Sequence, residues 1–262
     1  FIKIYNGKNL SKLEATNAFK IIMSGQALNI EITAFLTALS LKGISDDELL
    51  SAVKVLRSRS VKVKAGNNII DTCGTGGDKK NTLNISTATA ILSAACGIKV
   101  AKHGNRSVSS LSGSSEVLEK LGINIFAPIH KVEKSIKKIG VCFLMAPLYH
   151  KAMKNVSEVR NVLKIPTIFN ILGPLLNPAN AKFQLIGVYS KEWMMPIARC
   201  LRSLKVKKAW VVHGDDGLDE ITTNTSTNVI EVFNNKIKKF TINPLSLNLR
   251  KSKIKYLRGK NP

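Results

Sequence analysis

The first sixty residues carry apolar side chains at helical spacing, interrupted by short polar turns. A capping box at residues 11–14 predicts the start of a helix that runs to Met23. Asn29 is predicted to cap a second helix, which ends at Gly43. Another capping box at residues 45–48, with acids in the first turn, predicts a third helix. The N-terminal pattern therefore predicts a small helical bundle.

After a polar connection at 62–68, apolar stretches alternate with helical patterns that often end at glycine. This alternation predicts an α/β fold with a mostly parallel central sheet and helices on its faces. We expect a helical domain over 1–65 and an α/β domain over 66–262, with a proline-punctuated hinge segment at about 150–178 packing back on the helices. The predicted strands are 69–73, 98–101, 141–146, 184–189 and 209–213, and the predicted helices are 86–96, 114–121, 128–139, 150–163 and 192–204.

Composition narrows the class of protein. Hydrophobic residues make up 44% of the 262 residues and mean hydropathy is +0.04, without an apolar run long enough for a membrane span. The N-terminus lacks an apolar leader and an initiator Met, so we expect no signal peptide and a few missing residues. The four cysteines are scattered and form no CxxC motif, which favours free thiols in a reducing compartment such as the cytoplasm.

The formal charge of +23 suggests nucleic acid or another polyanion as a partner. However, 32 of the 40 cationic residues are Lys, and the chain also contains 22 Asn, a bias that A/T-rich coding produces without selection for a partner. The charge accompanies no aromatic-interleaved patch and no recognised nucleic-acid module, so we expect no nucleic-acid partner. A positive field around a site for a phosphorylated substrate fits the same composition.

The strongest local motif is Asp71–Asp78, with three glycines in four residues, followed by hydroxyl residues at the start of a predicted helix. Glycines let the backbone approach a ligand and turn its N–H groups toward an anion, and the helix N-terminus adds further donors. The loop matches neither GxxxxGK[ST] nor GxGxxG, so neither a P-loop nor a Rossmann site is indicated. The alternative is an ordinary glycine turn.

Residues 102–110 follow the predicted strand 98–101 and contain two cations, an amide and three hydroxyls. Loops at the carboxyl ends of parallel strands share one edge, so we expect this segment to face the glycine loop and to suit a phosphate and its sugar. Ser112–Ser115 opens another helix with the same anion-binding logic. The alternative is a solvated polar loop.

Four carboxylates occur within six residues at 215–220, directly after the predicted strand 209–213. Hard oxygen ligands of this kind suit Mg²⁺, which combines one or two carboxylates with substrate phosphates and water. The alternative is an acidic turn. His103 lies between Lys102 and Arg106, whose charges disfavour a protonated imidazole, so we do not expect it to act as a general base.

Together these motifs resemble the anthranilate phosphoribosyltransferase family, and the resemblance covers nearly the whole chain. The family signatures stand as GTGGD at 74–78, NIST at 84–87, KHGNRSVSS at 102–110, a proline-rich segment at 146–179 and HGDDGLDE at 213–220. The resemblance implies transfer of a phosphoribosyl group to the amine of anthranilate, two Mg²⁺ ions and a homodimer joined through the helical domain. It implies no general base, since positioning and charge neutralisation suffice.

The resemblance also implies site residues. One Mg²⁺ is expected at Ser86 and the other at Asp219 and Glu220, while anthranilate is expected to contact Gly74, Asn105 and Arg160. The expected phosphoribosyl pyrophosphate site comprises Gly74, Gly77, Asp78, Thr82, Asn84, Ile85, Ser86, Thr87, Lys102, His103, Gly104, Asn105, Arg106, Ser107, Val108, Ser109, Ser110 and Ser114.

The chain departs from the family pattern at three places. Lys79 stands where glycine is usual, Lys-Ile-Pro at 164–166 replaces a Leu-Gly-x-Arg sequence, and the family continues with further helices after the position of Pro262. Two other functions remain open on the sequence: a pyrimidine nucleoside phosphorylase-like enzyme, which needs no Asp-Glu metal pair, and a non-catalytic regulator, which the presence of Asn105 and Arg160 disfavours.

Overall fold

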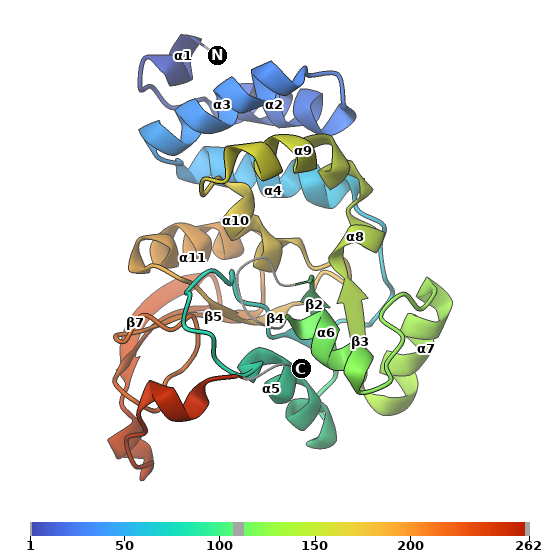
Figure 1. Cartoon of the computed structure of the whole chain (residues 1–262), viewed down its shortest axis with the longest axis vertical. Coiled ribbons are helices and arrows are strands. Elements are labelled where there is room, and N and C mark those ends of the chain that lie inside the picture. Colours follow the sequence, from blue (N-terminus) through green and yellow to red (C-terminus); the bar gives the residue numbers. More distant parts are fainter. Residues whose placement is uncertain (1, 107–112, 260–262) are drawn as a thin grey trace.

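A layer of helices lies on one side of an α/β unit in the computed structural model, which describes residues 2–106 and 113–259 (Figure 1). The layer contains α1 (Ile2–Tyr5), α2 (Lys12–Ser24), α3 (Asn29–Lys42) and α4 (Asp46–Arg59), and α9 (Lys154–Leu163) packs against α2 and α3. The predicted fold class, a helical bundle with a larger α/β unit around a mostly parallel sheet, is confirmed.

The starts of the N-terminal helices follow the sequence pattern with one exception. Capping boxes open α2 at Ser11 and α4 at Ser45. The prediction that Asn29 caps α3 is wrong, because Leu28 is the N-cap and its N–H donates to Glu31 at 2.8 Å. The Asn29 amide instead donates to Glu158 of α9 at 3.0 Å. It ties two helices together and does not cap one.

The central sheet has seven strands in the order β3-β2-β1-β4-β5-β6-β7. The first five strands in this order form four parallel pairs, whereas β5-β6 and β6-β7 pair antiparallel. All five predicted strands are present, but β6 and β7 were not predicted. The strands are β1 (Ile70–Asp71), β2 (Val100–Gly104), β3 (Val141–Met145), β4 (Phe183–Gly187), β5 (Lys208–Gly214), β6 (Thr227–Phe233) and β7 (Lys236–Ile242).

Helices connect the parallel strands and lie within a few residues of their predicted positions. The predicted helix at 150–163 is a short 3-10 turn that leads into α9. The other helices are α5 (Ile85–Ala95), α6 (Ser114–Lys120), α7 (Ile129–Ile139), α8 (Ala146–Tyr149), α10 (Phe169–Leu172) and α11 (Met194–Ser203), and the 3-10 turns are η1 (Lys151–Met153), η2 (Gly173–Leu176), η3 (Lys191–Trp193), η4 (Pro244–Leu247) and η5 (Ile254–Leu257).

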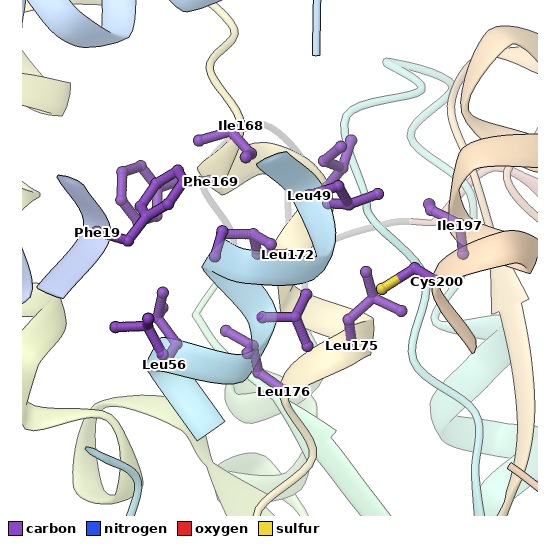
Figure 2. Packing of buried hydrophobic residues seen from close by; sticks show 14 of the residues in the cluster. Phe19, Leu49, Leu56, Ile168, Phe169, Leu172, Leu175, Leu176, Ile197 and Cys200 are labelled. Atoms are coloured by element: carbon purple, nitrogen blue, oxygen red, sulfur yellow. The ribbon is translucent and has the colours of Figure 1, made fainter. Parts of the chain in front are cut away.

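The segment from α10 to η2 fills the space between the helical layer and the sheet. Figure 2 shows Leu172 and Leu175 of this segment in one cluster with Leu49 of α4 and with Ile197 and Cys200 of α11. Arg57 of α4 adds polar contacts by donating to the Leu175 carbonyl at 2.6 Å. One continuous core therefore joins helices near the N-terminus to the α/β unit, and the domain boundary at residue 65 stays a prediction.

Lys164 ends α9 in the left-handed conformation, with φ of 51°, and its N–H donates to the Arg160 carbonyl. A Cβ at this backbone angle costs about 1 kcal/mol, and glycine avoids the clash. We therefore expect Lys164→Gly to raise the free energy of unfolding by roughly 0.5 to 1 kcal/mol in urea denaturation. Lys164→Ala keeps the Cβ and is the matched control; an equal gain in both variants would exclude the backbone angle as the cause.

Candidate active site

The loop after β1 meets strand β2 at one edge of the sheet, because the two strands are neighbours and parallel. Lys102, which is buried, reaches from β2 to the glycine loop and the start of α5. Its Nζ donates to the Thr72 carbonyl at 3.0 Å and lies 3.3 Å from Ser86 Oγ. A buried cation is thus placed beside the first turn of a helix, where backbone N–H groups also favour an anion.

The acidic segment after β5 lies against the glycine loop. Asp219 Oδ2 accepts a hydrogen bond from the Gly76 N–H at 2.9 Å, and a Cβ at Gly74 would stand 3.1 Å from the same oxygen. The Asp219 carbonyl oxygen would lie only 1.4 Å from a Cβ at Gly187, the last residue of β4. Glycine at 187 is therefore required for the acidic segment to approach the sheet this closely.

Asp78, Asp219 and Glu220 form a cluster of neighbouring carboxyl groups. Burial raises the pKa of Asp219 to about 7, with the nearby Asp78 as the next cause. Burial also raises the pKa of Glu220 to about 8, reinforced by the charge of Asp219 and opposed by Lys102. Asp78 Oδ2 is buried and receives no hydrogen bond from the described residues.

These carboxyl groups fit a divalent cation. Oxygen donors that repel one another, and one of which lacks a hydrogen-bond donor, are the environment that Mg²⁺ stabilises. Ser86 lies near the same groups, because its backbone N–H donates a hydrogen bond to the carboxyl group of Glu220.

The raised pKa values predict a pH dependence of stability. Without Mg²⁺ the folded chain holds protons on Asp219 and Glu220 that the unfolded chain releases above their ordinary pKa values of 3.8 and 4.5. This contribution to stability is complete below those values and is lost as pH rises through about 7 to 8. Urea denaturation in EDTA should show the decline. It should be smaller in Asp219→Asn/Glu220→Gln, and an unchanged decline in that variant would contradict the assignment.

Asp71 and Asn177 are buried and join the hinge segment to the sheet, and the sequence predicted a role in the site for neither. The Asp71 carboxylate accepts hydrogen bonds from Asn177 Nδ2 at 2.7 Å and from the His103 N–H at 3.1 Å, while Asn177 also donates to the Ala101 carbonyl at 2.8 Å. Asp71 was visible in the glycine motif, but its neighbour Asn177 is more than a hundred residues away in sequence. Their contact holds the segment from α10 onward against β1 and β2.

His103 is buried in this region and its Nδ1 lies 3.1 Å from the Gly173 carbonyl. Burial, followed by the neighbouring His150, lowers the pKa of His103 to about 3, which makes it a weak base.

Ligand atoms of Asp71, Cys73 and His103 lie within 4.8 Å of one another. Burial raises the pKa of the Cys73 thiol, and Asp71 is occupied by hydrogen bonds, so this group is structural.

The remaining described residues of the expected phosphate site lie on the glycine loop, at the start of α5, at the end of β2 and at the start of α6. Arg106 pairs with Glu119 of α6 at 3.1 Å, and Thr82 pairs with Arg258 in an isolated bridge. Ser107, Val108, Ser109 and Ser110 lie outside the described residues. Gly77 lies in the glycine loop, Asn84 is the N-cap of α5, Ile85, Ser86 and Thr87 form its first turn, Gly104 ends β2, Asn105 follows it, and Ser114 begins α6.

Arg160 lies on α9, in the helical layer. Its guanidinium carbon is 5.5 Å from the centroid of the Phe169 ring, and partial burial lowers its pKa. In the part of the chain that the structure describes, no carboxylate pairs with it. No described contact joins it to Gly74 or Asn105, so that expected acceptor site stays a prediction.

Family models match both parts of the chain. A glycosyl transferase family helical bundle domain matches residues 1–60, and a glycosyl transferase family a/b domain matches residues 66–262. The fold and the site therefore define a member of this glycosyl transferase family. No helix within the described ranges is both long and apolar enough to cross a membrane.

Relatives narrow the family further. Anthranilate phosphoribosyltransferase from Persephonella marina is 47% identical over 98% of this chain and 76% of the relative, and that from Rhodospirillum rubrum is 46% identical over 99% and 75%. The crystal structure of the Thermus thermophilus enzyme matches with a TM-score of 0.93 and 36% identity, covering all of this chain and 78% of the other. The Saccharomyces cerevisiae enzyme in complex with PRPP and Mg matches with a TM-score of 0.89 and 30% identity, covering 100% and 76%.

The chain belongs to the anthranilate phosphoribosyltransferase family. The family that the sequence motifs predicted is confirmed.

Proposed function

We propose that this protein transfers the phosphoribosyl group of 5-phosphoribosyl 1-pyrophosphate to the amine of anthranilate, giving N-(5-phosphoribosyl)anthranilate and pyrophosphate, a step of tryptophan biosynthesis. The observation that carries the proposal is the convergence of Lys102, the start of α5 and the carboxyl groups of Asp219 and Glu220 at one edge of the sheet. Membership of the family agrees with it.

The residues around Lys102 suit a diphosphate. Lys102 Nζ and the N–H groups of the glycine loop and α5 offer positive charge and donors to the pyrophosphate oxygens, whose negative charge increases as the bond to the ribose carbon breaks. Mg²⁺ would be held by Ser86 on one side and by Asp219 and Glu220 on the other, and when bound it neutralises the same charge. We propose two ions, as the resemblance to the family implies, one at Ser86 and the other at Asp219 and Glu220.

Arg160 suits the carboxylate of anthranilate. A half-buried guanidinium that pairs with no carboxylate of the described residues can donate two hydrogen bonds to a planar carboxylate, and the Phe169 ring lies beside it. Gly74 and Asn105 complete the proposed acceptor site from the α/β side. The neutral aryl amine then attacks the ribose carbon opposite the leaving pyrophosphate, and no strong base is needed because the cationic nitrogen loses its proton readily.

The assembly and location are part of the same proposal. Large apolar side chains are exposed on the helical layer, including Leu13, Leu28, Ile30 and Leu41, and they support a homodimer formed through this layer. All four cysteines are free, which supports the reducing environment of the cytoplasm.

The experiment that tests the function follows anthranilate fluorescence after adding the protein, phosphoribosyl pyrophosphate and Mg²⁺, with EDTA in the control. A decrease in anthranilate fluorescence that EDTA abolishes, together with release of an equimolar amount of pyrophosphate, would support the transfer. Release of a free base from a nucleoside with inorganic phosphate would instead support a phosphorylase. Binding of both substrates without turnover would support a non-catalytic regulator.

A further inference from the structure

Consecutive carbonyl groups of the turn η2 bond to side chains from three different elements. The pairs are His103 Nδ1 of β2 with the Gly173 carbonyl at 3.1 Å, Gln184 Nε2 of β4 with the Pro174 carbonyl at 2.9 Å, and Arg57 Nε of α4 with the Leu175 carbonyl at 2.6 Å. A turn that is bonded in this way cannot slide or rotate without losing several hydrogen bonds together.

Gln184 is a buried primary amide in a strand whose other side chains are apolar. Its Oε1 is buried as well and receives no hydrogen bond from the described residues. An amide in such a place costs free energy unless its hydrogen bonds compensate for the lost water. The bond to Pro174 is therefore what distinguishes Gln184 from an apolar side chain of the same size.

Asp71 binds the same segment from the neighbouring strand. Asp71 of β1 and Gln184 of β4 are register partners in a parallel pair, so their side chains lie on one face of the sheet. The Asp71 carboxylate accepts from Asn177 at 2.7 Å, and Gln184 donates to the Pro174 carbonyl. The sheet thus binds the segment at two places, once through an acceptor and once through a donor.

The apolar side chains of the segment face a different task. Leu172, Leu175 and Leu176 belong to the core that also contains Leu56 of α4 (Figure 2). Hydrophobic contacts of this kind have no preferred direction, whereas a hydrogen bond weakens when its angle changes. The core therefore holds the segment between the layers, and the hydrogen bonds to η2 fix its orientation.

The position of η2 affects the two proposed substrate sites differently. Phe169 of α10, which directly precedes η2, has its ring centroid 5.5 Å from the guanidinium carbon of Arg160. Lys102, in contrast, is held within the α/β unit by its bond to the Thr72 carbonyl at 3.0 Å. A shift of η2 would thus move Phe169 relative to Arg160 and leave Lys102 in place.

We propose that Gln184 is a positioning residue for the acceptor site. Its hydrogen bond to the Pro174 carbonyl fixes η2 on the sheet, and η2 in turn fixes Phe169 beside Arg160. Gln184 acts through this segment and is assigned no contact with either substrate. The inference rests on the proposed function, in which Arg160 binds the carboxylate of anthranilate.

The test compares Gln184→Met with the wild type in steady-state kinetics, because methionine has a similar volume but no hydrogen-bond donor. The KM for anthranilate should rise about five- to tenfold, the factor that corresponds to one side-chain hydrogen bond to a carbonyl. The KM for phosphoribosyl pyrophosphate should stay nearly unchanged, and kcat should change less than the KM for anthranilate. Amide hydrogen exchange at residues 168–176 should become faster.

Ser135→Ala is the matched control. It removes a hydrogen bond of the same kind, from Ser135 Oγ of α7 to the Val141 carbonyl at 2.7 Å, at the amino end of β3. A purely structural loss lowers the free energy of unfolding in both variants, but only Gln184→Met should change the KM for anthranilate. Gln184→Asn, whose amide is too short to reach Pro174, replaces Gln184→Met if the latter does not fold.

An unchanged KM for anthranilate in the Gln184 variant would overturn the proposal, as would an equal rise in the KM for both substrates. A wild-type protein without any transfer activity would instead contradict the proposed function. Hydrogen exchange then decides the role of Gln184, because unchanged exchange at 168–176 in the variant would show that Gln184 does not fix the segment.

Discussion

Replacing Asp219 and Glu220 together by alanine should lower kcat by at least about a thousandfold, at any practical Mg²⁺ concentration. Both carboxyl groups are buried beside Asp78, and burial, reinforced by repulsion between the carboxyl groups, raises the pKa of each. Removing them leaves no acidic pair on this segment to bind Mg²⁺ near Lys102. Stopped assays of pyrophosphate release across a Mg²⁺ titration measure the effect.

The matched control is Asp215→Ala, which removes an exposed acid of the same segment. Asp215 pairs with Lys191 at 2.7 Å on the surface, so its loss should change kcat less than twofold. The double variant should remain folded, since two mutually repelling buried acids are removed. Full activity of Asp219→Ala/Glu220→Ala would exclude these residues as metal ligands.

Arg160→Ala should raise the KM for anthranilate by about a hundredfold, the value expected for the loss of a charge-assisted bidentate contact of about 3 kcal/mol. The KM for phosphoribosyl pyrophosphate should stay nearly unchanged, because Arg160 lies on α9 in the helical layer and Lys102 lies in the sheet. Initial rates with each substrate varied in turn separate the two constants.

Arg160→Lys is the control for this prediction. It keeps the positive charge but loses the planar pair of donors, so its KM for anthranilate should fall between those of the wild type and Arg160→Ala. Equal losses for both substrates would mean that the acceptor lies elsewhere. Unfolding measurements on both variants show whether the lost contact with Phe169 affects stability.

The sequence predicted those parts of the fold that depend on local pattern. Helix starts were predicted from the capping boxes at Ser11 and Ser45, and the parallel strands from their apolar runs, because residues adjacent in sequence form these patterns. Asn29 was assigned wrongly because its partner, Glu158, is contributed by a helix distant in sequence. Strands β6 and β7 were missed, and much of β7 faces solvent.

The candidate site likewise has parts that the sequence predicted and parts that depend on the tertiary fold. The glycine loop, Lys102 and the acidic segment were predicted as separate motifs, and parallel strand order implied that the first two share an edge. The contact between Asp71 and Asn177 and the requirement for glycine at 187 were not predictable, because both depend on tertiary approach. The repulsion between Asp78 and Asp219 also appears only when the loops are folded together.

The lysines of strand β7 affect how molecules of this protein aggregate. Strand β7 is the last strand of the described sheet and pairs on one side only, with β6. Lys236, Lys238 and Lys239 are exposed along it. Two molecules that approach along these unpaired edges bring like charges together before backbone hydrogen bonds can form. The lysine excess thus opposes edge-to-edge aggregation, and high salt, which screens these charges, should weaken this protection.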